Sequence, residues 1–449
     1  MLAVVSMQWG YHIGAGLIAI ALPFRAVEIG LTTSQLGTVV SMEHGVLLIV
    51  LAPAFVMLRQ SVGASWAIAS VASVCACGCA VIGWAWSYPF MFGSAITVGA
   101  FASGEDLLVT SYVMQCTEPA QRAEVMTSLV LQYSIFSALG NAAYRPYDML
   151  LSYSGLPAEY HLRATMELCP GLCVLTIAWL VHRARFVEAE VSEASAATWA
   201  KVHMPVQSAM SSSGTSLAQQ QSQRVVVMLC LSTQCLMTMF SMVFFTMWPV
   251  FTREHFGWGP DEYSQALLLA TISQTSALFI MPKVLQSFGA PMTVWSLSTV
   301  GLIAGFFAFI LQDSAHVLVT VHVSLACLFK ACVAAQAPGL TALASNAVSN
   351  SQQTAITSVM SVSKVVGSTV GGVVGSRLYQ ISAGLGAAAA TALSAGGRSE
   401  IVCPLTQRLW CGGTLPLALL LLPCLGSVTW LVRTVLRNAE ARQQWKELQ

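Results

Sequence analysis

The sequence predicts an all-α membrane protein with twelve transmembrane helices arranged as two pseudo-symmetric six-helix bundles. The 449 residues are 56% hydrophobic and 9% charged, with a mean hydropathy of +0.69, whereas about a quarter of the residues in a soluble domain are charged. Apolar runs of about twenty residues, enough to cross roughly 30 Å of hydrocarbon, recur along the chain. One long polar segment, from Arg183 to Arg224, divides these runs into two sets.

Six apolar runs precede the polar segment, and six follow it. Those before it cover residues 5–24, 34–58, 65–86, 90–112, 123–144 and 165–181. Those after it cover residues 225–250, 263–285, 292–311, 317–336, 354–376 and 415–432. Each run meets the length expected of a transmembrane helix. The Ala- and Gly-rich stretch from Ile381 to Gly397 is too weakly hydrophobic for a span, so we expect an extension of the preceding helix or a loop.

These runs divide the chain into four parts: an N-terminal six-helix bundle (1–183), a linker (184–224), a C-terminal six-helix bundle (225–435) and a tail (436–449). The linker is rich in Ser, Gln and Gly, which predicts a flexible or locally helical segment. Basic residues are modestly enriched at the span ends that share a side with the linker and both termini. The positive-inside rule therefore predicts that the termini and the linker are cytoplasmic.

Composition and motifs argue against several classes of protein. A net charge of +1 without a basic cluster disfavours nucleic-acid binding. The sequence has no phosphate-binding loop and no H-E-x-x-H motif, so we expect no ATP-driven transport, enzyme activity, metal site or cofactor. Most of the 13 cysteines lie in apolar runs, and the close spacing of Cys75, Cys77 and Cys79 favours packing over metal binding because no His or acid accompanies it. Cys403 and Cys411 lie in a loop, as a disulfide in an oxidising compartment or as two free thiols.

A short internal repeat relates the two sets of runs. Gln-Ser-Val-Gly-Ala (60–64) follows the second run and Gln-Ser-Phe-Gly-Ala (286–290) follows the eighth, an offset of 286 − 60 = 226 residues. The repeat places Gly63 and Gly289 at equivalent turns. Parallel repeats of six spans are a known architecture of membrane transporters.

With two six-helix halves, a polar middle segment and a glycine turn after spans 2 and 8, the chain resembles the major facilitator superfamily. The second half carries the strongest resemblance: FGWGPDEYSQALLLA (256–270) and SVMSVSKVVGSTVGG (358–372) look like helices 8 and 11 of drug and tetracycline proton antiporters. The resemblance implies gating roles for the turns at Gly63 and Gly289. It also implies one for Arg122, because TEPAQRAE (117–124) keeps the family's acid, Pro and Arg pattern.

The chain also departs from the family's pattern. The family's turn after helix 2 carries an Asp and basic residues, and this chain has Gln60, Ser61, Ala64 and Ser65 there. Arg122 therefore lacks its usual Asp partner. The Gly-Pro-x-x-Gly-Gly signature of antiporter helix 5 is absent from ALGNAAYRP (138–146).

Few ionisable side chains fall inside the predicted spans, where each charge costs at least about 2.5 to 3.5 kcal/mol. The offset of 226 residues pairs Glu105 with Ala331, so the acidic pair in span 4 and Lys330 in span 10 lie at nearly the same level. The resemblance implies that helices 1, 4, 7 and 10 line one cavity, which the acids of one half and the base of the other would face. The charged candidates are Glu43, Glu105, Asp106, Lys330 and Lys364.

Each candidate has two interpretations. Glu105 or Asp106 is a proton carrier, because a buried carboxylate beside a like charge takes up a proton readily, or else part of an ion pair that ties helices together. Lys330 recognises a carboxylate or other anion of the substrate, or it forms a salt bridge with the acidic pair.

Three further positions complete the set of candidates. Glu43 is a coupling or gating residue, or it pairs with the proposed gating residue Lys364 where helices 2 and 11 meet. His12 and Gln234 are expected to line the cavity and bind substrate, although a histidine in a span is commonly a packing residue.

Together these features predict a secondary active transporter that moves a small organic solute, favoured to be an anion or a zwitterion, by alternating access. We expect protons as the coupling ion, a lipid bilayer as the surroundings and a monomer as the working unit. The alternatives are a facilitative uniporter of the same fold and a receptor or chaperone that keeps the fold without transporting.

Overall fold

The computed structural model describes residues 9–43, 47–116, 122–179, 181, 217–310, 316–348, 353–395 and 414–447, and within these residues the chain is helical with short turns. The first half contains α2 (Trp9–Glu28), α3 (Thr33–Glu43), α4 (Leu48–Val62), α5 (Ala64–Gly83), α6 (Tyr88–Cys116), α7 (Arg122–Tyr153), the 3-10 turn η2 (Ala158–Tyr160) and a helix over residues 161–179. The second half contains α9 (Leu217–Phe256), α10 (Pro260–Ile310), α11 (His316–Asn346), α12 (Gln353–Ala395) and α14 (Thr414–Glu447).

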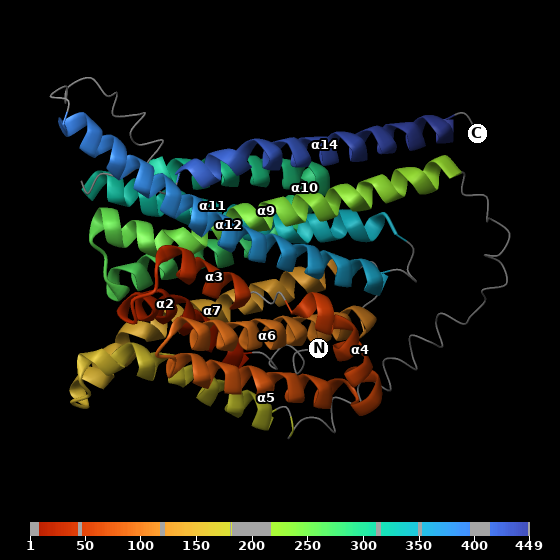
Figure 1. The fold of residues 1–449 in the computed structure, drawn as a ribbon. Coiled ribbons are helices and arrows are strands. Elements are labelled where there is room, and N and C mark those ends of the chain that lie inside the picture. The colour runs from red at the N-terminus through yellow and green to blue at the C-terminus, as the bar shows by residue number, and fades with distance from the viewer. Residues whose placement is uncertain are drawn as a thin grey trace.

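These helices make up twelve spans in two six-helix bundles, which confirms the predicted fold class. α3 and α4 together form the second span, and α10 forms the eighth and ninth because its backbone turns at Gly289. Eight helices among the described residues are long and apolar enough to cross a membrane by length and composition alone. The two halves lie beside each other with their helices running roughly parallel and antiparallel (Figure 1).

The internal repeat is visible in the backbone. Gly63 has φ 85° and ψ 165°, and Gly289 has φ 73° and ψ 156°. A positive φ of this kind favours glycine, which has no Cβ to clash with the neighbouring carbonyl. The two glycines are 289 − 63 = 226 residues apart, the offset found in the sequence. Both halves therefore make the same turn at the same place.

Two predicted boundaries are wrong. α9 begins at Leu217, so residues 217–224 of the predicted linker extend the helix beyond its span. α14 continues to Glu447, so the predicted tail is helical through that residue. The physical reason is the same at both ends: Ala, Gln, Lys and Arg are good helix formers, and extending a helix that already exists requires no new nucleation.

Other predictions about the same regions are settled only in part. α12 runs on through Ala395, so residues 381–395 extend the eleventh span, and residues 396 and 397 lie outside the described residues. Cys403, Cys411 and linker residues 184–216 lie outside them as well.

The bundle has two distinguishable ends. α9 begins and α14 ends at one of them, which we call the linker end (Figure 1). The connections α2–α3, α7–η2 and α9–α10 lie at the opposite end, which we call the loop end (Figure 1). Each of these three connections contains a glycine with positive φ: Gly30, Gly155 and Gly257.

Side-chain caps fix where α3 and α10 start at the loop end. The amide of Thr32 donates to Gln35 Oε1 at 2.9 Å, and the amide of Gln35 donates to Thr32 Oγ1 at 3.3 Å. At the start of α10 the amide of Gly259 donates to Glu262 Oε2 at 2.9 Å. These bonds satisfy amides that the first helical turn leaves without partners.

The halves meet along two helix pairs. α3 packs on α12 through small residues: a Cβ at Gly37 would overlap Ser376, and a Cβ at Gly372 would overlap Ser41. Small residues of this kind let two membrane helices approach closely. α7 and α10 are joined by hydrogen bonds instead, described with the site below.

Candidate functional site

The acidic pair lies in the interior of the first half, on α6. Glu105 is 1% exposed and Asp106 is partly buried. Because neighbours on a helix lie about 100° apart, the two carboxylates reach different surroundings. Asp106 lies close enough to His12 on α2 and Tyr133 on α7 for its charge to act on both. Glu105 also acts on Tyr133, and on Cys75 of α5.

His12 occupies the centre of this group. Its ring stacks on Tyr133 with centroids 4.1 Å apart and planes 23° apart. Its Nε2 is buried and has no hydrogen-bond partner among the described residues. Lys364, an exposed residue of α12 in the other half, lies near enough for its charge to act on His12 as well. The structure therefore brings together three predicted residues, Asp106, His12 and Lys364, and adds Tyr133.

Lys330 lies on α11 and does not join the acidic pair. Its Nζ donates to Thr271 Oγ1 of α10 at 2.7 Å and lies 5.6 Å from the centroid of the Phe245 ring. The described part of the chain contains no ion pair of Lys330 with Glu105 or Asp106. The alternative that Lys330 forms a salt bridge with the acidic pair is therefore wrong, because the ammonium has a hydroxyl partner within its own half.

Thr271 connects the two halves. Besides accepting from Lys330, its Oγ1 accepts from Asn141 Nδ2 of α7 at 3.0 Å. Along the same helix pair, the hydroxyls of Ser134 and Thr275 are 2.8 Å apart. The Lys330 ammonium is thus one hydrogen bond away from the contact between α7 and α10.

The remaining predicted residues are placed less informatively. Gln234 Nε2 donates to Thr238 Oγ1 at 3.0 Å on its own helix, α9. Glu43 is the last residue of α3 and Arg122 the first of α7, and their side chains lie outside what the structure describes. Gly63 and Gly289 form the equivalent turns at the end of span 2 and of span 8.

The sequence analysis missed Tyr133, Asn141 and Thr271. Hydroxyls are common in apolar helices, so Tyr133 and Thr271 carry no distinctive signal. Asn141 does carry one, because a carboxamide inside a membrane span needs a hydrogen-bond partner and so marks a helix contact.

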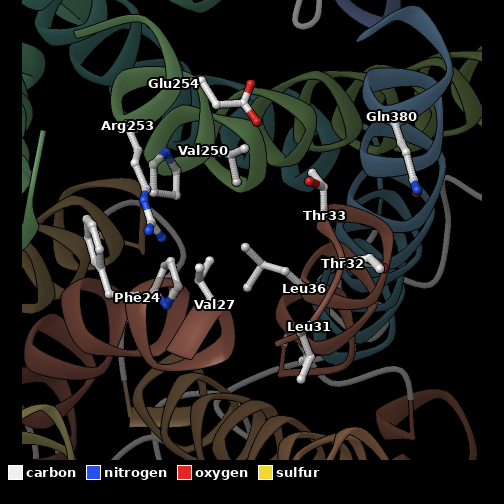
Figure 2. A pocket seen from close by; sticks show the side chains of 12 residues that line it. Phe24, Val27, Leu31, Thr32, Thr33, Leu36, Val250, Arg253, Glu254 and Gln380 are labelled. Atoms are coloured by element: carbon white, nitrogen blue, oxygen red, sulfur yellow. The ribbon is translucent and has the colours of Figure 1, made fainter. Parts of the chain in front are cut away.

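A pocket of about 460 Å³ opens between the halves at the loop end, lined by residues of α2, α3, α9 and α12 and of the α2–α3 connection. This volume lies within the roughly 300 to 1,000 Å³ typical of small-molecule sites. Figure 2 shows apolar side chains such as Phe24, Val27 and Leu36 facing Val250 across it. Arg253 and Glu254 are the charged residues of its lining.

Within the part of the chain that the structure describes, no group of three or more His, Cys, Asp or Glu residues is arranged to hold a metal ion. The cysteines described there are free thiols.

Comparison with known proteins identifies the fold. A family model for the Major Facilitator Superfamily matches residues 4–372. A structure of a proton-dependent oligopeptide transporter is similar with a TM-score of 0.65 at 11% identity, over 96% of this chain and 97% of that one. A bacterial homologue of the human lysosomal transporter Spinster gives 0.64 at 13% identity, over 97% of each chain. The nucleoside transporter NupG gives 0.61 at 11% identity, over 95% of this chain and 99% of that one. A comparison with curated protein sequences gives no match.

Proposed function

The chain belongs to the major facilitator superfamily, and from that premise we propose that it moves a small organic anion or zwitterion by alternating access, with protons as the coupling ion. Its family and its structural neighbours are transporters, not enzymes, and it is an integral multi-pass membrane protein. The observation that carries the proposal is the gathering of Asp106, His12 and Lys364 from two halves that must move relative to each other.

Proton coupling follows from where these charges lie. An ionised Asp106 attracts the Lys364 ammonium, and taking up a proton removes that attraction. Because Asp106 belongs to the first half and Lys364 to the second, protonation changes how strongly the halves are held together around His12. Glu105 supplies a second buried carboxylate at the same level of α6. Keeping charges at this depth is costly, which favours a functional role.

The preference for an anionic group on the solute comes from Lys330. Its ammonium is held by a neutral hydroxyl, and a carboxylate is a stronger acceptor for it. A solute carboxylate that draws Lys330 away from Thr271 would also alter the Asn141–Thr271 contact between the halves. Solute binding and the rocking of the halves would then be linked through one side chain.

The test begins with a thermal-stability screen of organic anions and zwitterions on the purified protein, because a ligand that binds only the folded state raises its apparent stability. A stabilising compound is then assayed for uptake into proteoliposomes that contain a pH-sensitive dye. We expect an imposed pH gradient to drive uptake, and solute addition alone to change the internal pH.

The decisive variant is the double substitution Glu105→Gln with Asp106→Asn. It is expected to reduce gradient-driven uptake to the level of empty liposomes while solute exchange without a gradient continues. Glu28→Gln, at an exposed acid paired with Arg25 at 3.0 Å, is the matched control and should behave as wild type. Wild-type coupled uptake in the double variant would contradict the proposal. Uptake that ignores the pH gradient in the unaltered protein would instead identify a uniporter.

A further inference from the structure

The pocket at the loop end combines an apolar interior with two opposite charges. Phe24 and Leu36 are buried, Val27 is partly buried, and Val250 faces them from the second half. Arg253 and Glu254, by contrast, are exposed. The pocket draws its lining from both halves, so anything bound in it contacts both.

The two charges do not neutralise each other. Arg253 and Glu254 are neighbours on α9, where side chains diverge by about 100°, and they form no ion pair within 4.0 Å. Figure 2 shows the Arg253 guanidinium reaching toward Phe24 of α2, whereas the Glu254 carboxylate leaves α9 on the side of Thr33 and Gln380. Each charge therefore marks a different part of the same cavity, with apolar side chains in between.

The glutamate is held in place and still has capacity to bind. Tyr379 of α12 donates its hydroxyl hydrogen to Glu254 Oε2 at 2.5 Å. An ionised carboxylate accepts about four hydrogen bonds, so it can accept from an ammonium as well. The Arg253 guanidinium has five N–H donors in a fork that fits a carboxylate, and no ion pair of Arg253 occurs among the described residues.

We propose that this pocket binds a zwitterionic organic solute whose carboxylate and ammonium groups are separated by an apolar body. The carboxylate binds Arg253, the ammonium binds Glu254, and the body lies against Phe24, Val27 and Leu36. The inference rests on the proposed function for its biological meaning, because the pocket would hold the solute at the loop end of the route between the halves. Binding itself requires no transport.

The test uses three probes of nearly the same shape: 4-(aminomethyl)benzoate, which carries both charges, 4-methylbenzoate, which lacks the ammonium, and 4-methylbenzylamine, which lacks the carboxylate. Affinity is measured by calorimetry on the full chain in lipid nanodiscs. We expect the zwitterion to bind at least about tenfold more tightly than either single-charge probe, since each charge-assisted hydrogen bond is worth about a factor of ten or more.

Four variants locate the binding. Arg253→Gln should weaken the zwitterion and 4-methylbenzoate but not 4-methylbenzylamine, and Glu254→Gln should do the reverse for the two single-charge probes. Arg377→Gln, at an exposed arginine of α12 outside the lining, and Glu28→Gln are the matched controls and should change nothing. Val27→Trp fills the cavity without altering either charge and should remove binding of all three probes. Unchanged thermal unfolding midpoints show that the variants are folded.

The proposal is overturned if the three probes bind equally, if Arg253→Gln and Glu254→Gln change affinity no more than their controls, or if the zwitterion shows no saturable binding up to about 10 mM, beyond which a site is too weak to be specific. The headgroup of a zwitterionic lipid carries the same chemistry as a free solute. Affinities that agree in discs of phosphatidylglycerol and of phosphatidylethanolamine support the free solute. A tenfold weaker affinity in phosphatidylethanolamine would overturn that assignment in favour of the lipid.

The outcome is separable from that of the transport assay. Binding that depends on Arg253 and Glu254, in a protein without proton-coupled uptake, would keep the pocket and refute the coupling. Coupled uptake of a solute that ignores both substitutions would do the opposite.

Discussion

The interiors of the two halves differ although their backbones repeat. In the first half α2, α6 and α7 gather ionisable and polar groups, with Asp106 near His12 and Tyr133. In the second half α9, α10 and α11 pack aromatic rings against one another. The fully buried rings there belong to Phe240, Phe244, Trp248, Phe251, Phe309 and Phe329.

Two histidines show the difference most clearly. His322 of α11 is completely buried; its Nε2 accepts from the indole N–H of Trp248 at 2.9 Å, and its Nδ1 faces the Ala308 carbonyl oxygen at 2.7 Å. One nitrogen must accept and the other must donate, so the partners assign the neutral form with the hydrogen on Nδ1. His12 has a buried Nε2 without a partner among the described residues and charged groups from both halves nearby.

The comparison indicates a division of labour. A second proton on His322 would break its bond with Trp248, so that histidine serves packing. A proton on His12 costs no hydrogen bond at Nε2 and changes its interaction with Asp106 and Lys364. We infer that the second half provides a rigid body and that the first half provides the groups that respond to protons.

The largest expected effect is on the aromatic interior. Trp248→Ala should lower the free energy of unfolding by about 3 to 5 kcal/mol, because it leaves a cavity in a fully buried cluster. Trp430→Ala, at a residue that is 63% exposed, should change it by less than about 1 kcal/mol. Thermal unfolding in detergent measures both. Similar losses for the two variants would mean that the aromatic cluster does not make the second half rigid.

The next effect separates the two histidines. His322→Phe keeps a ring but leaves the Trp248 N–H and the Ala308 carbonyl without partners, at a cost of about 2 to 4 kcal/mol. His12→Phe keeps the stacking on Tyr133, so stability should change by less than about 1 kcal/mol, whereas the pH dependence of uptake should flatten. Unfolding and the pH profile of uptake are measured for each variant. A flattened profile in folded His322→Phe, or an unchanged one in His12→Phe, would break the comparison.

The smallest effect tests what the halves share. Gly63→Ala and Gly289→Ala each place a Cβ in a backbone conformation reserved for glycine, and each should cost about 1 to 3 kcal/mol. Gly171→Ala in the first half and Gly426→Ala in the second are the controls. A Cβ meets nothing within 4 Å at either position, so stability should be unchanged or slightly higher. Unequal losses for Gly63 and Gly289, measured by thermal unfolding, would show that the repeated turn does not bear the same load in both halves.

Several site residues could be predicted from the sequence because a charge in an apolar run is costly wherever it lies. That argument identified Glu105, Asp106 and Lys330 without any knowledge of their neighbours. It did not identify the partners, since Tyr133, Asn141 and Thr271 are neutral and lie 28 or more residues from the charged groups they serve. Nor did it foresee that Lys330 bonds to Thr271 rather than to the acidic pair.

The sequence by itself determined the fold class, the division into two halves and the repeated glycine turn. Hydrophobic length and left-handed glycines are local properties that can be read along the chain. Only the tertiary structure decided that Asp106, His12 and Lys364 meet and that Arg253 and Glu254 line a pocket between the halves. The physical reason is that side-chain contacts depend on how helices rotate and pack against one another, and small residues such as Gly37 and Gly372 fix that packing across long separations in sequence.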